Sequence, residues 1–298
     1  MTSSELDRHS ASTNYATACP EISKVSRQIW YPDEGGPTKE PTGIRKINVG
    51  LFLPAGQELW HQHHEKCGGE YQSPILIVRH RAIPLPLRAV EMIGYHDPLP
   101  GPLNLTNNGH SGSLSSVIQP TNVVMLRPEG LGRVKHPPAV YGALLKDHYV
   151  MDTLHFHWGL RDYRGSEHRV NGVRYPMEMH IVHRKQNYES VQEAIGYSDG
   201  LSVLAFFFEV REKENPKLQP LLKKLKQVAL EGESVHLDST FTMASLLPQD
   251  LEIYYTYRGS LTTPPCSEVV TWIVFPEPQF ISYRQVSNAI QGTNLPPT

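Results

Sequence analysis

Two short runs place histidines at alternate positions, and this spacing limits most strongly how the chain can fold. Residues 150–158 read VMDTLHFHW, and residues 178–183 read EMHIVH. The first run is apolar and β-branched, which is typical of a strand, and the second is also a strand candidate. Because side chains alternate between the two faces of a strand, His155 and His157 project from one face of the first run. A second strand can bring His180 to the same point.

The side chains beside these histidines separate a polar face from an apolar face. Thr153 shares the face of the first two histidines, and Glu178 and Val182 share the face of the third. The residues on the opposite faces are Leu154, Phe156, Trp158, Met179, Ile181 and His183. All but the last are apolar, which suits a core. We therefore expect three imidazoles on one side of a sheet and a core on the other.

Three histidines on one side of a sheet match the donor set of a catalytic zinc site. Such a site leaves a fourth position open for water, whereas a structural site has four protein ligands, and no obvious fourth ligand is near. Zinc acidifies bound water, so hydroxide exists near neutral pH. A lone histidine is more often structural or solvated, and an HxH pair leaves both interpretations equally open. The third histidine, His180, favours zinc.

Two further polar residues support a reactive metal site. Glu178 can pair with a surface arginine, but ligating histidines usually donate their second ring N–H to such an acceptor, which is the role we favour. Residues 260–265, SLTTPP, place the Thr262 hydroxyl in a loop held by two prolines. A threonine beside the metal can orient a metal-bound hydroxide. The combination therefore points to a reaction, and not merely to a metal.

Together these residues resemble the alpha-class carbonic anhydrases. The similarity runs from about Glu58 to about Val286, and its motifs occur in the family's order. The motifs are CGGEYQSPI at 67–75, NNGH at 107–110, HFHWG at 155–159, GSEH at 165–168, EMHIVH at 178–183, GLSVL at 200–204 and GSLTTPPCSEVVTWIVF at 259–275. Several such strings in order are far more specific than any one of them.

The resemblance implies a single, mainly β domain, with peripheral helices around a large, twisted, mostly antiparallel central sheet. Residues 58–298 would form the catalytic domain, truncated at its C-terminus because the chain ends at NLPPT, where the family usually continues. Residues 1–57 fit the family poorly and are expected to be an atypical, partly disordered segment. Strand-like runs dominate the chain, and leucines at helical spacing predict one helix over 216–230.

The resemblance also assigns roles to residues within the motifs. His155, His157 and His180 would hold Zn²⁺. Thr262 would accept a hydrogen bond from the zinc-bound hydroxide and donate its own proton to Glu167. The implied reaction is the reversible hydration of carbon dioxide to bicarbonate and a proton by that hydroxide.

His110, in the NNGH motif, matches the family's proton shuttle. A histidine titrates near neutral pH and can relay the proton that zinc-bound water must lose in each turnover. From the residues alone, a solvated loop histidine is the better interpretation of this polar stretch. With the resemblance, we favour the shuttle.

The resemblance further implies a small apolar pocket for carbon dioxide, which has no net dipole. The residues of its wall would be Val182, Val203, Leu261, Val270 and Trp272. Thr263 would lie beside bound substrate, and the Thr262 N–H would contact bicarbonate or inhibitors such as sulfonamides and anions. Glu178 and Thr153 would support the ligating histidines through hydrogen bonds. We expect the protein to be a monomer.

Cys67 and Cys266 fall where secreted and membrane-bound members of the family place a disulfide. The bridge would tie the start of the domain to the loop of Thr262, and it would indicate an extracellular, secreted protein. Two reduced cysteines in a cytosolic enzyme are the alternative, and residues 1–23 contain no apolar stretch of the signal-peptide type. Cys19 is left over.

Composition limits the other functions. A formal net charge of −2 with 39% hydrophobic residues gives no sign of nucleic-acid or membrane-surface binding through bulk charge. No apolar run is long enough to span a membrane. The main rival is a non-catalytic, carbonic-anhydrase-like binding module, inactive through the missing C-terminal tail. A different metal-dependent β-sheet enzyme would explain HFH but not SLTTPP together with GSEH.

Overall fold

The computed structural model describes residues 28–30, 60–107, 122–159 and 165–292. The strands are β1 (Gln28–Trp30), β2 (Leu76–Ile77), β3 (Ile83–Leu85), β4 (Arg88–Ile93), β5 (Leu103–Asn107), β6 (Asn122–Pro128), β7 (Ala139–Ala143), β8 (Tyr149–Trp158), β9 (Arg169–Val170), β10 (Met177–Lys185), β11 (Leu201–Arg211), β12 (Ser234–His236), β13 (Tyr254–Gly259) and β14 (Val270–Ser282). The α-helices are α1 (Trp60–His63), α2 (Val191–Ala194), α3 (Gln219–Leu222) and α4 (Tyr283–Gly292). The 3-10 turns are η2 (Glu65–Gly68), η3 (Arg79–Arg81), η4 (Leu131–Arg133), η5 (Pro216–Leu218), η6 (Leu225–Val228) and η7 (Met243–Leu246).

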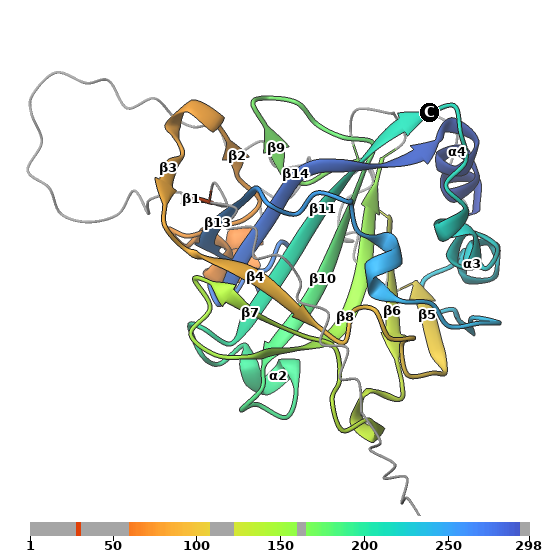
Figure 1. Ribbon diagram of the computed structural model, residues 1–298, viewed down its shortest axis with the longest axis horizontal. Coiled ribbons are helices and arrows are strands. Elements are labelled where there is room, and N and C mark those ends of the chain that lie inside the picture. Colours follow the sequence, from red (N-terminus) through yellow and green to blue (C-terminus); the bar gives the residue numbers. More distant parts are fainter. Residues whose placement is uncertain (1–27, 31–59, 108–121, 160–164, 293–298) are drawn as a thin grey trace, which may run out of the picture.

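One 12-stranded sheet organises the described residues (Figure 1). Its main order is β12-β5-β6-β8-β10-β11-β14-β13-β1-β3, and β7 joins β4 to β8. The β11–β14 and β1–β13 pairs are parallel, and the other described pairs of this sheet are antiparallel. The helices are short and lie at the periphery. The predicted fold class, mainly β around one large, mostly antiparallel sheet, is confirmed.

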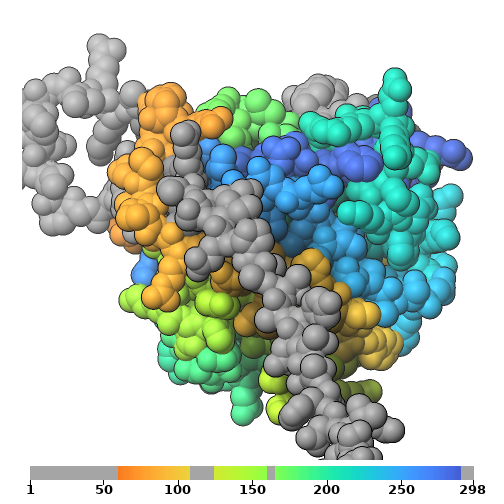
Figure 2. All heavy atoms as spheres, in the orientation of Figure 1, coloured from red at the N-terminus to blue at the C-terminus, as the bar shows by residue number. Residues whose placement is uncertain are grey.

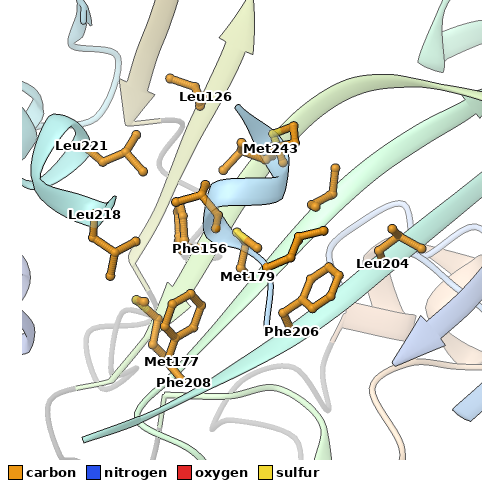
Figure 3. Close-up of a cluster of buried hydrophobic side chains, with 14 of the residues drawn as sticks. Leu126, Phe156, Met177, Met179, Leu204, Phe206, Phe208, Leu218, Leu221 and Met243 are labelled. Atoms are coloured by element: carbon orange, nitrogen blue, oxygen red, sulfur yellow. The ribbon is translucent and has the colours of Figure 1, made fainter. Parts of the chain in front are cut away.

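The larger hydrophobic core lies on the sheet face opposite the three histidines. Phe156 on β8, Met179 on β10 and Phe206 on β11 are buried there. Leu218 and Leu221, from η5 and α3, pack against this face from outside (Figure 3). Burying an aliphatic or aromatic side chain contributes about 1.5–3 kcal/mol. This face therefore supplies much of the free energy that holds the central strands in place.

A second hydrophobic cluster lies on the face that carries the histidines. Its members include Val203 and Phe207 on β11, Tyr257 on β13 and Trp272 on β14. Because residues 204, 206 and 208 of the same strand join the first cluster, β11 alternates between two buried faces. The histidines of β8 and β10 are thus bordered by apolar residues of β11 and β14.

The prediction of one helix over 216–230 is wrong. The structure has three short turns in this segment, namely η5, α3 and η6. Pro220, in the first turn of α3, explains the break between η5 and α3, because proline lacks the N–H that a continuous helix needs and its ring clashes with the carbonyl four residues earlier. The leucine spacing still reflects core packing, since Leu218, Leu221 and Leu225 are buried.

Two segments that are distant in the sequence meet beside the loop after β13. Cys67 in η2 is bonded to Cys266, with the two Cα atoms 4.9 Å apart, which confirms the predicted disulfide. In the space-filling view, orange atoms of the early segment border blue atoms of the C-terminal third (Figure 2). The loop that contains Thr262 is therefore covalently tied to η2.

Residues 28–30 form β1, which pairs with β13 in parallel and with β3 in antiparallel orientation. They place three residues of the predicted segment 1–57 within the sheet, and the rest of that segment lies outside the described residues. The boundary between residues 57 and 58 stays a prediction. Among the described helices, none is long and apolar enough to cross a membrane.

Candidate metal centre

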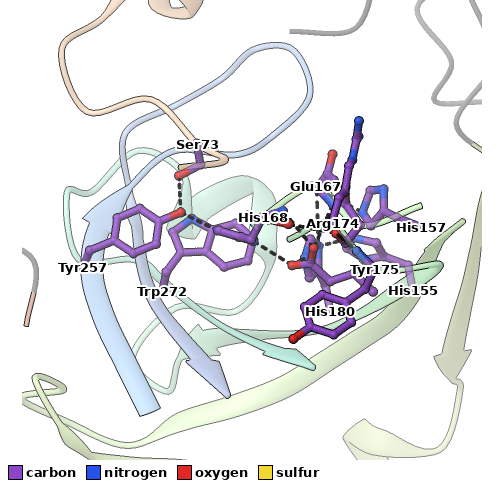
Figure 4. A network of polar contacts seen from close by, with 12 residues as sticks. Ser73, His155, His157, Glu167, His168, Arg174, Tyr175, His180, Tyr257 and Trp272 are labelled. Atoms are coloured by element: carbon purple, nitrogen blue, oxygen red, sulfur yellow. Dashed lines mark hydrogen bonds and ion pairs between the residues drawn. The ribbon is translucent and has the colours of Figure 1, made fainter. Parts of the chain in front are cut away.

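Adjacent antiparallel strands bring the three predicted histidines together. His155 on β8 lies directly opposite His180 on β10, and His157 is two residues farther along β8. His155 Nε2 and His180 Nδ1 are 3.2 Å apart. One nitrogen from each of the three rings lies within 4.8 Å of the others (Figure 4). This spacing allows one metal ion to contact all three rings.

A buried carboxylate determines which nitrogen of His180 faces this point. His180 Nε2 is 2.7 Å from Glu178 Oε1, and His168 Nδ1 is 2.6 Å from the same oxygen. Burial alone raises the pKa of the Glu178 carboxyl, but the charges and hydrogen bonds of His168 and His180 outweigh it and hold that pKa well below its usual value. An ionised carboxylate only accepts, so both rings donate to it. His180 therefore keeps the Nδ1 lone pair for a metal.

His168, Glu178 and His180 form a second group with polar atoms within 4.8 Å of one another. Direct hydrogen bonds of 2.6 and 2.7 Å already join those atoms. No space for an ion is left between them. We therefore interpret this group as the hydrogen-bonded support of His180 and not as another metal site.

Glu167 reaches the same point because its backbone is held against β10. The Glu167 N–H donates to Glu178 Oε2 at 2.8 Å. Gly165 permits this close approach, since a Cβ there would lie 1.6 Å from the Pro176 carbonyl oxygen. The nearby Thr262 hydroxyl favours the ionised Glu167 carboxylate and so lowers its pKa, although burial outweighs this effect. The structure thus places Thr262 near Glu167.

Burial sets the protonation of two groups at this point. Burial, together with His180 and His155, lowers the pKa of His157 well below its ordinary value. That shift favours the neutral imidazole, which is the form that binds metals. Burial and the nearby Glu178 raise the pKa of Glu167 to about 8. A cation at the histidines would lower this pKa again, because an opposite charge favours the carboxylate.

Unused polar atoms make this point suitable for a cation. Within the described residues, both ring nitrogens of His157 and the Oε2 atom of Glu167 are buried without a hydrogen-bond partner. His157 Nε2 and Glu167 Oε2 are 3.3 Å apart, in a geometry that forms no hydrogen bond. Leaving a buried polar group unpaired costs about 1–3 kcal/mol. Three imidazole nitrogens facing one point are a donor set that fits zinc.

Thr262 lies in a compact loop rather than on a strand. The Leu261 N–H donates to the Ser267 carbonyl at 3.0 Å, and the Cys266 N–H donates to the Thr263 carbonyl at 2.9 Å. Thr262 and Thr263 are both half-buried. The loop keeps its shape through these internal bonds, while its position depends on contacts with other segments.

Apolar residues form a row across the sheet beside the histidines. Val182 on β10 lies opposite Val203 on β11, and Val203 lies opposite Trp272 on β14. The Trp272 ring stands at a steep angle to the His180 ring, with centroids 4.9 Å apart. The metal-facing point therefore has an apolar side and a polar side, the latter provided by Glu167.

A family model described as eukaryotic-type carbonic anhydrase matches residues 55–293. The chain belongs to this family. Carbonic anhydrase 6 of Mus musculus is 34% identical over 236 residues, which cover 78% of this chain and 68% of the relative. Carbonic anhydrase 6 of Homo sapiens is 36% identical over 231 residues, covering 76% and 68%. Carbonic anhydrase 15 of Mus musculus is 35% identical over 235 residues, covering 78% and 68%.

The remaining residues predicted for a carbonic anhydrase site, apart from His110, fall on the same face or in the adjacent loop. Thr153 is buried on β8, opposite Val182. Val270 belongs to the apolar cluster of this face, and Leu261 packs against it. His110 lies outside the described residues. The roles of all these residues in catalysis stay predictions.

Three buried residues near the candidate metal centre were not singled out from the sequence. His168 Nε2 lies 2.6 Å from Tyr257 Oη, which lies 3.0 Å from Ser73 Oγ (Figure 4). The GSEH motif could have indicated His168, because this residue directly follows Glu167 within it. Tyr257 and Ser73 are 184 residues apart, so no local pattern connects them.

Proposed function

We propose that this chain is a zinc-dependent carbonic anhydrase that reversibly hydrates carbon dioxide to bicarbonate and a proton. The observation that carries the proposal is the convergence of nitrogens from His155, His157 and His180 on two paired strands. Membership of the carbonic anhydrase family supports it. So does the carboxylate of Glu167, which faces the same nitrogens.

The three histidines would hold the metal through His155 Nε2, His157 Nε2 and His180 Nδ1. Zinc in such a site supplies the nucleophile at neutral pH, because it lowers the pKa of bound water to about 7, the value known from carbonic anhydrase itself. Glu178 accepts from the second ring nitrogen of His180 at 2.7 Å, which keeps that ring oriented.

Thr262 and Glu167 would act together as an orienting pair. Once a bound cation keeps Glu167 ionised, Thr262 would donate its hydroxyl proton to it, and the Thr262 oxygen could then only accept a further hydrogen bond. An attacking hydroxyl group would therefore donate its hydrogen to the Thr262 oxygen, and its own oxygen lone pair would be directed away from Thr262. Thr262 and Glu167 would thus contribute by orienting the attacking oxygen.

The apolar row would receive carbon dioxide. Val203 and Trp272 are 2% exposed, so they offer a dry wall to a substrate without a net dipole. Val182, Leu261 and Val270 extend this wall in our proposal. Thr263 and the Thr262 N–H would contact bicarbonate, or anion and sulfonamide inhibitors that take its place.

His110 would carry the product proton to buffer. General acid–base groups contribute about 10²–10⁴-fold to turnover. Replacing His110 with Ala should therefore slow carbon dioxide hydration in weak buffer, and added imidazole should restore it. An unchanged rate in weak buffer would remove His110 from the mechanism.

The disulfide points to an oxidising compartment, because cytosolic thiols are kept reduced. We accordingly propose that the protein acts outside the cell, as a secreted carbonic anhydrase.

The proposed function is tested by zinc content and sulfonamide-sensitive carbon dioxide hydration of the purified chain. We expect about one zinc per chain, and loss of both zinc and activity in His157→Ala. His236→Ala is the matched control, since the His236 side chain is 58% exposed on β12 and lies away from the site. Folded protein without zinc, or hydration unaffected by His157→Ala, would refute the proposal.

A further inference from the structure

Ser73 and Ser260 form a reciprocal pair of hydrogen bonds in the interior. The Ser73 N–H donates to Ser260 Oγ at 2.9 Å, and the Ser260 N–H donates to Ser73 Oγ at 3.1 Å. Ser260 is completely buried, and Ser73 is 8% exposed. Ser260 stands two residues before Thr262, at the start of the loop. Ser73 therefore fixes the point from which this loop leaves β13.

The same Ser73 hydroxyl is connected to the metal side of the site. Ser73 Oγ lies 3.0 Å from Tyr257 Oη, and Tyr257 Oη lies 2.6 Å from His168 Nε2. His168 Nδ1 and His180 Nε2 share Glu178 Oε1, at 2.6 and 2.7 Å. An unbroken chain of hydrogen bonds thus runs from a metal-facing histidine to the hydroxyl of Ser73.

The surroundings leave little space for substitute partners. A Cβ added at Gly259 would lie 2.2 Å from Ser73 Oγ, so the backbone of β13 presses directly on this hydroxyl. Trp272 closes another side, because its Nε1–H donates to the Ser260 carbonyl at 3.1 Å. Enclosed polar networks are strengthened by the low local dielectric, and a lost member is not replaced cheaply.

A further set of restraints acts at the far end of the loop. Cys266 is bonded to Cys67, and Glu268 Oε1 accepts from the Tyr71 N–H at 2.7 Å and from Gln72 Nε2 at 2.9 Å. These contacts hold the end of the loop, whereas the Ser73 hydroxyl holds its start. The chain of hydrogen bonds that starts at Ser73 also continues to His180, which the contacts at the far end of the loop do not.

We propose that Ser73 is a positioning residue that couples the orientation of His180 to the position of the Thr262 loop. The inference rests on the proposed function, because it assigns His180 to the metal and Thr262 to the nucleophile. Coupling between two sites is reciprocal, so metal binding at His180 stabilises the Ser73–Ser260 pair to the same extent that this pair stabilises metal binding.

Ser73→Ala tests the coupling, with Ser202→Ala as its matched control. Ser202 is also a completely buried serine, but its hydroxyl has no hydrogen-bond partner in the described residues. We expect Ser73→Ala to release zinc to a chelator up to about 10-fold faster, as for other residues that support a metal ligand indirectly. We also expect a lower kcat with unchanged KM, because orientation is lost and substrate binding is not. Ser202→Ala should change neither.

A merely structural role for Ser73 would lower the melting temperature and leave zinc release and kcat unchanged, which would overturn the proposal. If wild-type chain binds no zinc, the proposed function itself fails. If wild-type chain binds zinc and is active while Ser73→Ala matches it, the coupling alone fails.

Amide hydrogen exchange of the wild-type chain tests the coupling without any substitution. Removing zinc with a chelator should speed exchange at the Ser73 and Ser260 N–H groups, while amides of the edge pair β5–β12 should keep their rates. Equal exchange at Ser73 with and without zinc would overturn the proposal, even if Ser73→Ala failed to fold.

Discussion

The two halves of the proposed site are held in different ways. The histidines lie on β8 and β10, which are paired with each other and flanked by β6 and β11, so backbone hydrogen bonds fix their spacing. Thr262 lies on a loop whose position depends on Cys67, Ser73 and other residues almost two hundred positions earlier. The metal half therefore follows from strand geometry, and the hydroxyl half from long-range contacts.

This difference shows where each half is vulnerable. Strand pairing is shared among many backbone bonds, so the loss of one contact moves a histidine very little. The loop has few anchors, and each one carries a larger share of its position. Damage to an anchor such as the disulfide, which is not connected to His180 as Ser73 is, should consequently impair orientation of the nucleophile before it impairs metal binding.

Removing the disulfide should give the largest effect. Cys67→Ala/Cys266→Ala should reduce the free energy of unfolding by about 2–5 kcal/mol, because the bond closes a loop of 199 residues. Urea unfolding of both forms measures this loss. If the halves are separable, the variant should also lose kcat while its zinc affinity stays near the wild-type value. An equal loss of zinc affinity would contradict the separation.

Thr262→Ala should lower kcat by about 100-fold, the cost expected when a reacting group loses its orientation. Stopped-flow hydration measures this effect, and Thr262→Ser is the control because it retains the hydroxyl. Zinc content should be normal in both variants. Zinc loss from Thr262→Ala would mean that the loop supports the metal as well.

Glu178→Gln should affect the opposite half. Because Glu178 accepts from His180 Nε2, its replacement should weaken zinc binding by about 10–100-fold. Competition with a chromogenic chelator measures the affinity. At saturating zinc, kcat should recover more fully than in Thr262→Ala. No change in zinc affinity would show that strand pairing alone orients His180.

The effect expected to disturb the site least is a pH dependence of stability on the core side of β10. Burial lowers the pKa of His183 to about 3, below its ordinary value of 6.5, and its Nε2 lies 2.7 Å from Tyr95 Oη. The folded state therefore binds fewer protons than the unfolded state between these values. Stability is full above pH 6.5 and falls by up to about 1.4 kcal/mol per unit as the pH drops toward 3.

Melting temperatures between pH 4 and 7 should therefore show a shallower acid slope in His183→Gln than in wild type. His236→Gln, which replaces an exposed histidine, should keep the wild-type slope. Identical slopes in all three proteins would exclude His183 as a source of acid sensitivity.

The sequence predicted the metal half well because alternation along a strand is a local property. His155 and His157 could be assigned to one face from their spacing, and the register between β8 and β10 then places His180 opposite His155. The pairing of Thr262 with Glu167 came from the resemblance to a family, since nothing local relates two residues so far apart.

The rest depended on the tertiary structure. Ser73 and His168 lie in loops and Tyr257 lies on β13, so these three residues meet only in the folded chain. Ser73 belongs to the CGGEYQSPI motif, but nothing local in that motif indicates a contact with Tyr257. In the segment 216–230, by contrast, the sequence predicted an element that the structure does not contain. Its leucine spacing predicted one helix, but the segment forms three short helical pieces, and Pro220 separates the first from the second.

The Cys67–Cys266 bond makes most of the chain a covalent ring. The two cysteines are 199 residues apart, and all three histidines lie between them. A single peptide-bond break in this span opens the ring but releases no fragment. A protease that nicks one exposed loop would thus leave a molecule of unchanged size on a non-reducing gel, which separates into two pieces only after reduction.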